Sequence, residues 1–109
     1  MLDSPANVLV IEGRVVQPAE MRTSPAGMPI SRFSIEHKSM CEEADLPREV
    51  QFLLAVVATG VVLQPQVASL QAGQRIRVRG FLARASYRAA EYRLVMHAQS
   101  IEYLNDADR

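Results

Sequence analysis

Cationic and aromatic side chains alternate over a short segment near the C-terminal end of the sequence. Arg84, Arg88 and Arg93 are interleaved there with Tyr87 and Tyr92. A guanidinium group pairs with phosphate and also stacks on planar groups, whereas a flat ring stacks on an unpaired base. Because a single-stranded nucleic acid offers both phosphates and unpaired bases, the segment has the side chains that a sequence-tolerant binder of single strands requires.

The formal net charge of zero hides an uneven distribution of charge along the chain. Residues 75–93 contain six arginines and one glutamate. The arginines are Arg75, Arg77, Arg79, Arg84, Arg88 and Arg93. Salt limits the reach of a surface charge to about 8–10 Å, so a neutral protein can still present a basic stripe to an anionic partner. Arg77 and Arg79 are therefore candidate contacts as well, although alternating charges on the solvent face of a strand also serve solubility alone.

Length and composition favour one small folded domain. A chain of 109 residues buries a single modest core, and forming an oligomer is a natural way to bury more surface. Hydrophobic residues make up 49% of the sequence, which excludes wholesale disorder. No segment approaches the roughly 18–20 apolar residues of a membrane span, and the N-terminal segment lacks the pattern of a secretion signal. We expect a cytoplasmic protein that does not associate with membranes.

The sequence offers little for catalysis or metal binding. Cys41 is the single cysteine, and with His37 and His97 it does not form a zinc-ligand spacing. A thiol nucleophile would also need an orienting third residue, which is not apparent. Both histidines are interpreted as structural residues within strands. We expect no enzymatic activity, no metal and no cofactor.

Periodicity predicts five strands that must position these side chains. They cover residues 7–17, 30–38, 48–60, 74–82 and 92–104. The proline-rich segment 18–29 and the acidic segment 41–47 are predicted loops, and residues 61–73, interrupted by Pro65, have room for one short helical turn. Gly13 suggests a bend in the first strand.

This order of elements is that of the OB-fold, a five-stranded Greek-key barrel of the all-β class. We expect one such domain over residues 1–109, with an ordered core at about 7–104. The strand at 48–60 is apolar on both faces, which favours a sheet centre or a subunit interface. The arginine–tyrosine loop, residues 83–93, then joins the last two strands and borders the binding groove. The alternative is a solvated hairpin whose arginines keep an edge soluble and whose tyrosines cover the barrel end.

Three segments resemble the primosomal replication protein N (PriB) family. They are "SPAGMPISRFSIEHKSMCEEA" (24–44), "GFL" (80–82) and "VMHAQSIE" (95–102), and the resemblance extends over residues 7–104. It implies an OB-fold homodimer, without enzymatic activity, that binds single-stranded DNA in the replication-restart primosome. Members of this family stabilise the PriA helicase on forked DNA and help to reload the replicative helicase.

The resemblance also implies a set of DNA-contacting residues. They fall on Lys38, Arg48, Phe81, Arg88 and Arg93. Gln51 occupies the position where a stacking ring is expected, and by alternation the neighbouring Phe52 points to the other face, where a packed core or interface ring is the favoured interpretation. Tyr87 and Tyr92 are therefore candidates for the missing stacking, with Arg84 beside them.

Two other functions remain compatible with the sequence. A protein-interaction adaptor of the primosome, with only marginal nucleic-acid binding, agrees with the zero net charge and with Gln51 in place of a ring. An RNA-binding OB module would use the same stacking chemistry.

Overall fold

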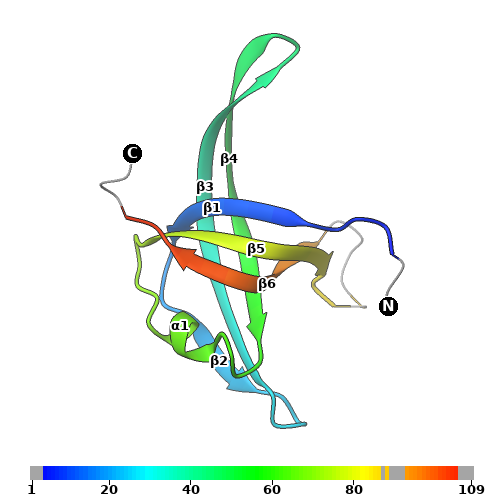
Figure 1. The fold of residues 1–109 in the computed structure, drawn as a ribbon, viewed down its shortest axis with the longest axis vertical. Helices are drawn as coiled ribbons and strands as arrows, with labels where there is room; N and C mark the ends of the chain where they lie inside the picture. The colour runs from blue at the N-terminus through cyan, green and yellow to red at the C-terminus, as the bar shows by residue number, and fades with distance from the viewer. Residues whose placement is uncertain (1–3, 87, 89–92, 106–109) are drawn as a thin grey trace.

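Six strands and one short helix form the part of the chain that the computed structural model describes, residues 4–86, 88 and 93–105 (Figure 1). The strands are β1 (Leu9–Val15), β2 (Glu20–Thr23), β3 (Pro29–Glu43), β4 (Leu46–Thr59), β5 (Arg75–Arg84) and β6 (Leu94–Tyr103). The helix α1 (Gln64–Ala68) lies between β4 and β5. In these ranges no helix has the length and apolar character needed to cross a membrane.

Five of the strands close into a barrel. The sheet has the order β1-β5-β6-β4-β3-β2, and a second pairing between β1 and β3 joins its two sides. That pairing brings Arg14 opposite Glu36 and Val15 opposite Ile35, while β4 and β6 run parallel to each other. The closed five-stranded barrel confirms the OB-fold predicted from the sequence.

Gly13 permits the closure. It pairs with Ile76 on β5 just before β1 begins to pair with β3. A β-carbon at this position would lie 2.7 Å from the carbonyl oxygen of Glu36. Only glycine allows two backbones to approach so closely without displacement, so β1 can bend here and pair with two strands.

Aliphatic side chains fill the barrel. The most buried large residues include Ile35, Ile76, Met96, Val15, Val56 and Val78. Val67 of α1 and Leu70 join the same cluster, so the helix covers one end of the barrel. Pro65 lies in the first turn of α1, where its missing N–H would have no intrahelical partner in any case. Pro65 therefore starts this helix rather than breaking it.

Strands β3 and β4 extend beyond the barrel as a long hairpin (Figure 1). Only Ala44 and Asp45 form its turn, and their φ angles of 55° and 65° match the twist of the flanking strands. The turn predicted within 41–47 is confirmed at residues 44 and 45, but the rest of the predicted loop is wrong, because that part of the segment continues the ladder up to the pair Glu43 and Leu46. Its acidic side chains are exposed, with Glu42 and Glu43 on β3 and Asp45 in the turn.

The predicted loop at 18–29 is wrong in part. Its central residues form β2, which pairs with β3 from Glu20 opposite Arg32 to Thr23 opposite Pro29. Prolines precede and follow these four residues instead of interrupting them. A short strand at the edge of a sheet tolerates prolines at its ends, because the missing N–H groups are not needed by the ladder.

Candidate nucleic-acid interface

Alternation divides the side chains of β3 and β4 between the core and the outer face of the barrel. Phe33 and Ile35 are buried, whereas Lys38 lies on the opposite, outer face, across from Gln51. The side chain of Lys38 is 63% exposed, and its Nζ is 3.8 Å from a carboxylate oxygen of Glu36. Such exposed ion pairs contribute little to stability, so the ammonium group of Lys38 is accessible to an external anion.

Phe81 forms a stacked ring pair on the same outer face. It lies opposite His97 across β5 and β6, and the two rings are parallel within 2° at a centroid distance of 5.1 Å. Both residues are half-buried. Sequence reasoning identified Phe81 but treated His97 as structural. The available signal was alternation, because His97 follows the core position Met96 and so points to the outer face.

Phe52 lies on the other face of the ribbon, as alternation predicts. It is opposite His37, and their rings stack at 4.9 Å with an interplanar angle of 29°. His37 Nδ1 donates to the carbonyl oxygen of Glu12 at 2.7 Å, and its Nε2 is 2.8 Å from the hydroxyl of Ser39. His37 therefore ties the hairpin to β1, which agrees with the structural role expected for it.

Arg48 does not join Lys38 on the outer face. It is opposite Cys41, which places it on the same side of the ribbon as Phe52 and near the tip of the hairpin. Its Nη1 donates to the Glu43 carboxylate at 2.5 Å. The structure thus separates two residues that the resemblance assigned to one site.

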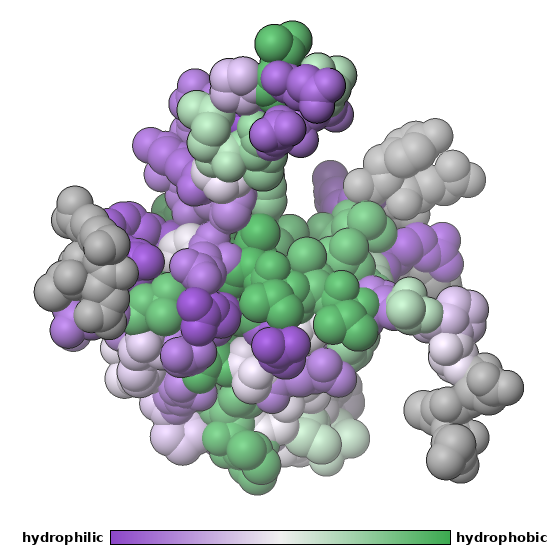
Figure 2. All heavy atoms as spheres, turned by 45° about the horizontal axis from the view of Figure 1, so that its top comes forward, coloured by the Kyte–Doolittle hydropathy of each residue, from purple (hydrophilic) through white to green (hydrophobic). Residues whose placement is uncertain are grey.

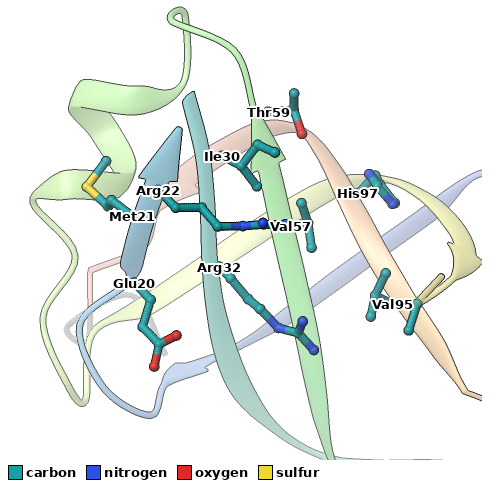
Figure 3. Close-up of a pocket in the computed structure, with 10 residues that line it drawn as sticks. Glu20, Met21, Arg22, Ile30, Arg32, Val57, Thr59, Val95 and His97 are labelled. Carbon is teal, nitrogen blue, oxygen red and sulfur yellow. The ribbon is translucent and has the colours of Figure 1, made fainter. Parts of the chain in front are cut away.

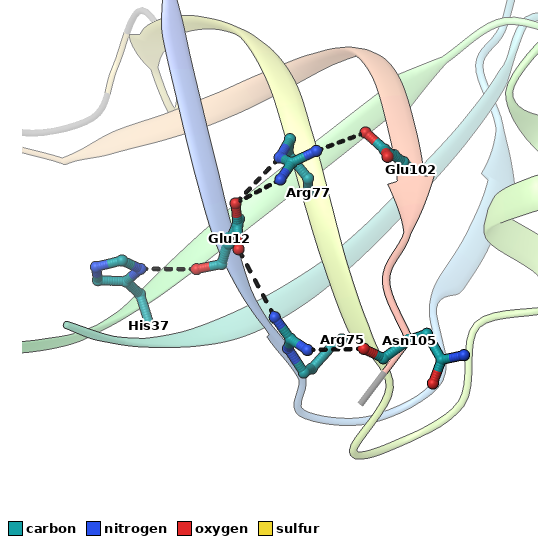
Figure 4. A network of polar contacts seen from close by, with 6 residues as sticks. All are labelled: Glu12, His37, Arg75, Arg77, Glu102 and Asn105. Carbon is teal, nitrogen blue, oxygen red and sulfur yellow. Dashed lines mark hydrogen bonds and ion pairs between the residues drawn. The ribbon is translucent and has the colours of Figure 1, made fainter. Parts of the chain in front are cut away.

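Arg77 forms ion pairs with two carboxylates of the same chain (Figure 4). Its guanidinium group lies 2.9 Å from a carboxylate oxygen of Glu12 and 2.9 Å from one of Glu102. The hydrogen bonds that Arg77 donates to the carboxylates of Glu12 and Glu102 raise the pKa of Arg77 above its ordinary value. Arg75 lies 3.9 Å from Glu12 and donates to the carbonyl oxygen of Asn105. These two arginines connect three neighbouring strands and the chain that follows β6.

The remaining candidates lie along β5 and in the arginine–tyrosine loop. Arg79 is exposed, opposite Ser100 and Val10, and forms no ion pair with a carboxylate that the structure describes. Arg84 ends β5, and Arg88 and Arg93 are exposed in the loop that follows it. Tyr87 and Tyr92 lie outside the described residues, so their proposed stacking remains a prediction.

Two outward cations were missed from the sequence. Arg22 on β2 and Arg32 on β3 line a pocket on the outer face, together with His97 (Figure 3). Arg22 was overlooked because its segment was assigned to a loop. The alternation that identified Lys38 places Arg32 on the same face and could have identified it.

A closed barrel with cations and a stacked ring pair on its outer face is typical of an OB-fold binding protein. Residues 7–100 match the family described as "Another single-strand binding protein family". The replication restart proteins PriB of Proteus mirabilis and Photorhabdus laumondii are 37% and 36% identical to this chain. Each alignment covers 94% of the chain, and the two cover 98% and 97% of the relatives. The chain belongs to this single-strand binding family, in the group of replication restart proteins PriB.

Solved structures show the same fold. A PriB structure from Ralstonia solanacearum has a TM-score of 0.80 and 27% identity, and the alignment covers 93% of this chain and all of the other. A Plasmodium falciparum SSB, solved in complex with single-stranded DNA, has a TM-score of 0.75 over 96% of this chain. At 14% identity, this second similarity concerns the fold alone.

Proposed function

We propose that this protein binds single-stranded DNA as a non-enzymatic accessory factor of replication restart. The observation that carries the proposal is the stacked pair of Phe81 and His97 beside outward cations on one face of the barrel. Bases stack on such rings, and cations follow the phosphates. The single-strand binding family and the names of the PriB relatives support the same function.

The proposed site has two parts. Lys38, Arg79, Phe81 and His97 form a rigid portion on strands, and Arg84, Arg88 and Arg93 supply charge from the arginine–tyrosine loop, with Tyr87 and Tyr92 as further stacking candidates. Arg77 contributes to the barrel rather than to DNA in this proposal, because two carboxylates already hold its guanidinium group.

The protein partners come from the resemblance to the family. The chain would stabilise the PriA helicase on forked DNA and assist reloading of the replicative helicase within the primosome. It would act as a homodimer in the cytoplasm. Figure 2 shows an apolar area at the foot of the hairpin, which supports the dimer, and several large apolar side chains are exposed, among them Val8 at 72%, Val10 at 42% and Leu53 at 67%.

Fluorescence anisotropy with labelled oligo-dT at two salt concentrations tests the proposal. The double variant Arg88→Ala/Arg93→Ala should lose most binding, and the salt slope should fall by about 0.7 for each phosphate contact removed. Arg77→Ala is the control, because Glu12 and Glu102 hold its guanidinium group and it lies outside the proposed site. If the wild type does not bind oligo-dT at low salt, the proposal is wrong.

The second candidate is a protein-interaction adaptor with marginal DNA binding. Gln51, which stands on the outer face where a ring was expected, favours it. In that case the double variant keeps the weak oligo-dT binding of the wild type while altering stimulation of the helicase. Matched DNA and RNA oligomers in the same assay would separate the first candidate from an RNA-binding module, since only the latter favours the strand with 2′-hydroxyls.

A further inference from the structure

A pocket of about 440 Å³ lies on the outer face of the barrel, at the end where β2 joins the sheet. Its apolar surface comes from Ile30, Val57 and Val95, which belong to three different strands. Arg22 and Arg32 extend over this surface toward β6 (Figure 3). The pocket therefore combines an aliphatic floor with two guanidinium groups.

The two arginines are not neutralised within the part of the chain that the structure describes. Neither lies within 4.0 Å of a carboxylate oxygen there, although Glu20 also lines the pocket and pairs with Arg32 in register. Arg77, by contrast, has two close carboxylate partners on β1 and β6. Two adjacent cations held on strands, with one acid beside them, attract a ligand that carries more than one negative charge.

Exposed aliphatic and thioether side chains continue the apolar surface past the pocket. The three residues of this aliphatic rim are Met28, 46% exposed, Val61, 68%, and Val62, 89%. A hydrogen bond from Gly60 N–H to the Pro29 carbonyl holds the turn before Val61 against the start of β3. The rim therefore adjoins the end of the pocket where Ile30 and Thr59 line it, and the pocket and rim together make a surface with two cations beside aliphatic side chains.

We propose that this surface docks a short acidic segment of a partner protein, with carboxylates on Arg22 and Arg32 and aliphatic side chains on the pocket floor and the rim. A single nucleic-acid strand fits it less well, because base recognition needs flat rings and His97 is the one ring among the described residues that line the pocket. The flexible Met28 and the exposed Val61 and Val62 instead suit aliphatic peptide side chains. The inference does not depend on the proposed DNA binding.

The test uses three fluorescein-labelled probes on the full chain: the peptide EEDLLV, its charge-reversed form KKKLLV, and oligo-dT. The wild type should bind EEDLLV and not KKKLLV. Arg22→Ala/Arg32→Ala should weaken EEDLLV binding at least about tenfold, since two charge-assisted hydrogen bonds are lost. Val61→Ser/Val62→Ser should weaken it severalfold while the fold is retained, because both side chains are exposed. Lys38→Ala, on the same face but outside the pocket, is the control.

Several outcomes would overturn the inference. One is the absence of EEDLLV binding at low salt, and another is equal binding of EEDLLV and KKKLLV. A third is a loss in Lys38→Ala as large as that in the pocket variant, which would indicate a diffuse charge effect. If the arginine variant loses oligo-dT binding while EEDLLV does not bind the wild type, the pocket belongs to the DNA site. That last result would support the proposed function and refute the docking of a peptide.

Discussion

Two arginines on β5, Arg77 and Arg79, have different surroundings. Arg77 and Arg79 both project outward from β5, yet Arg77 lies between Glu12 and Glu102 whereas Arg79 faces Val10 and Ser100. A guanidinium held by two carboxylates has fewer donors left for a phosphate. Outward orientation on the strand alone therefore does not decide which arginine can bind a ligand.

Alanine variants of these two arginines should separate stability from binding. Arg77→Ala should lower the urea midpoint, because it leaves Glu12 and Glu102 without their shared partner, and it should leave oligo-dT affinity nearly unchanged. Arg79→Ala should leave the midpoint unchanged and reduce the salt slope of oligo-dT binding by about 0.7. Urea denaturation and anisotropy titrations on the same samples measure both effects. The reverse pattern would show that Arg77 contacts DNA.

The stacked pair on the outer face makes a separate prediction. Phe81→Ala should weaken oligo-dT binding by about 1–3 kcal/mol, the range for losing one base stacked on a ring. Phe52→Ala is the matched control, because it removes the same ring from a histidine stack on the opposite face. Anisotropy titration of both variants at one salt concentration is sufficient. Equal losses in the two variants would argue that neither ring acts as a platform for bases.

The hairpin turn shows how an element can accept unfavourable residues. Ala44 and Asp45 both have positive φ angles, a region that costs a non-glycine residue roughly 1–2 kcal/mol. The long ladder between β3 and β4 on either side of the turn imposes this geometry. The turn is therefore a site where a better local sequence should stabilise the protein.

We predict that Asp45→Gly raises the free energy of unfolding by about 0.5–1 kcal/mol, since glycine adopts this φ without steric cost. Ala26→Gly is the control, because Ala26 lies in an exposed turn without a positive φ. There glycine only increases the entropy of the unfolded chain and should lower stability slightly. Thermal unfolding of the three proteins gives the comparison. A destabilised Asp45→Gly protein would mean that the aspartate side chain has a role in the turn.

Sequence patterns predicted the elements well where alternation is regular and poorly where polar residues continue a strand. The core positions of β3 and β5, such as Ile35 and Val78, follow from period-2 patterns. The outer half of the hairpin does not, because "CEEADLPRE" has turn composition and is held extended only by cross-strand bonds. The pair of Phe81 and His97 also depends on a register shift between Arg79 and Gly80. A single sequence does not contain that cross-strand information.

At the scale of the whole molecule, β1 has an open edge. The N–H of Val15 donates to the carbonyl of Gln74, and the carbonyl of Val15 accepts from the N–H of Gly73; both partners lie just before β5. The N–H of Val16 instead donates to the carbonyl of Ser34 on β3. Since alternate residues bond opposite edges, the backbone groups of Val10 point away from β5. In the described part of the chain no strand pairs with that edge at Val10. Because an open apolar edge is a ready site for pairing with another chain, this edge fits the proposed homodimer.

Charges placed on this edge should therefore separate the subunits without unfolding them. In Val8→Lys/Val10→Lys, both side chains are exposed in the single chain, so its fold should persist. Burying two valines at an interface contributes about 3 kcal/mol or more, so the dimer dissociation constant should rise at least about a hundredfold. Sedimentation equilibrium measures this change, and circular dichroism checks the fold. Val61→Lys/Val62→Lys is the matched control, because these valines are also exposed but lie beside the start of β3. If the wild type sediments as a monomer at micromolar concentration, the proposed dimer is wrong. If the Val8→Lys/Val10→Lys variant stays dimeric, the interface lies on another surface.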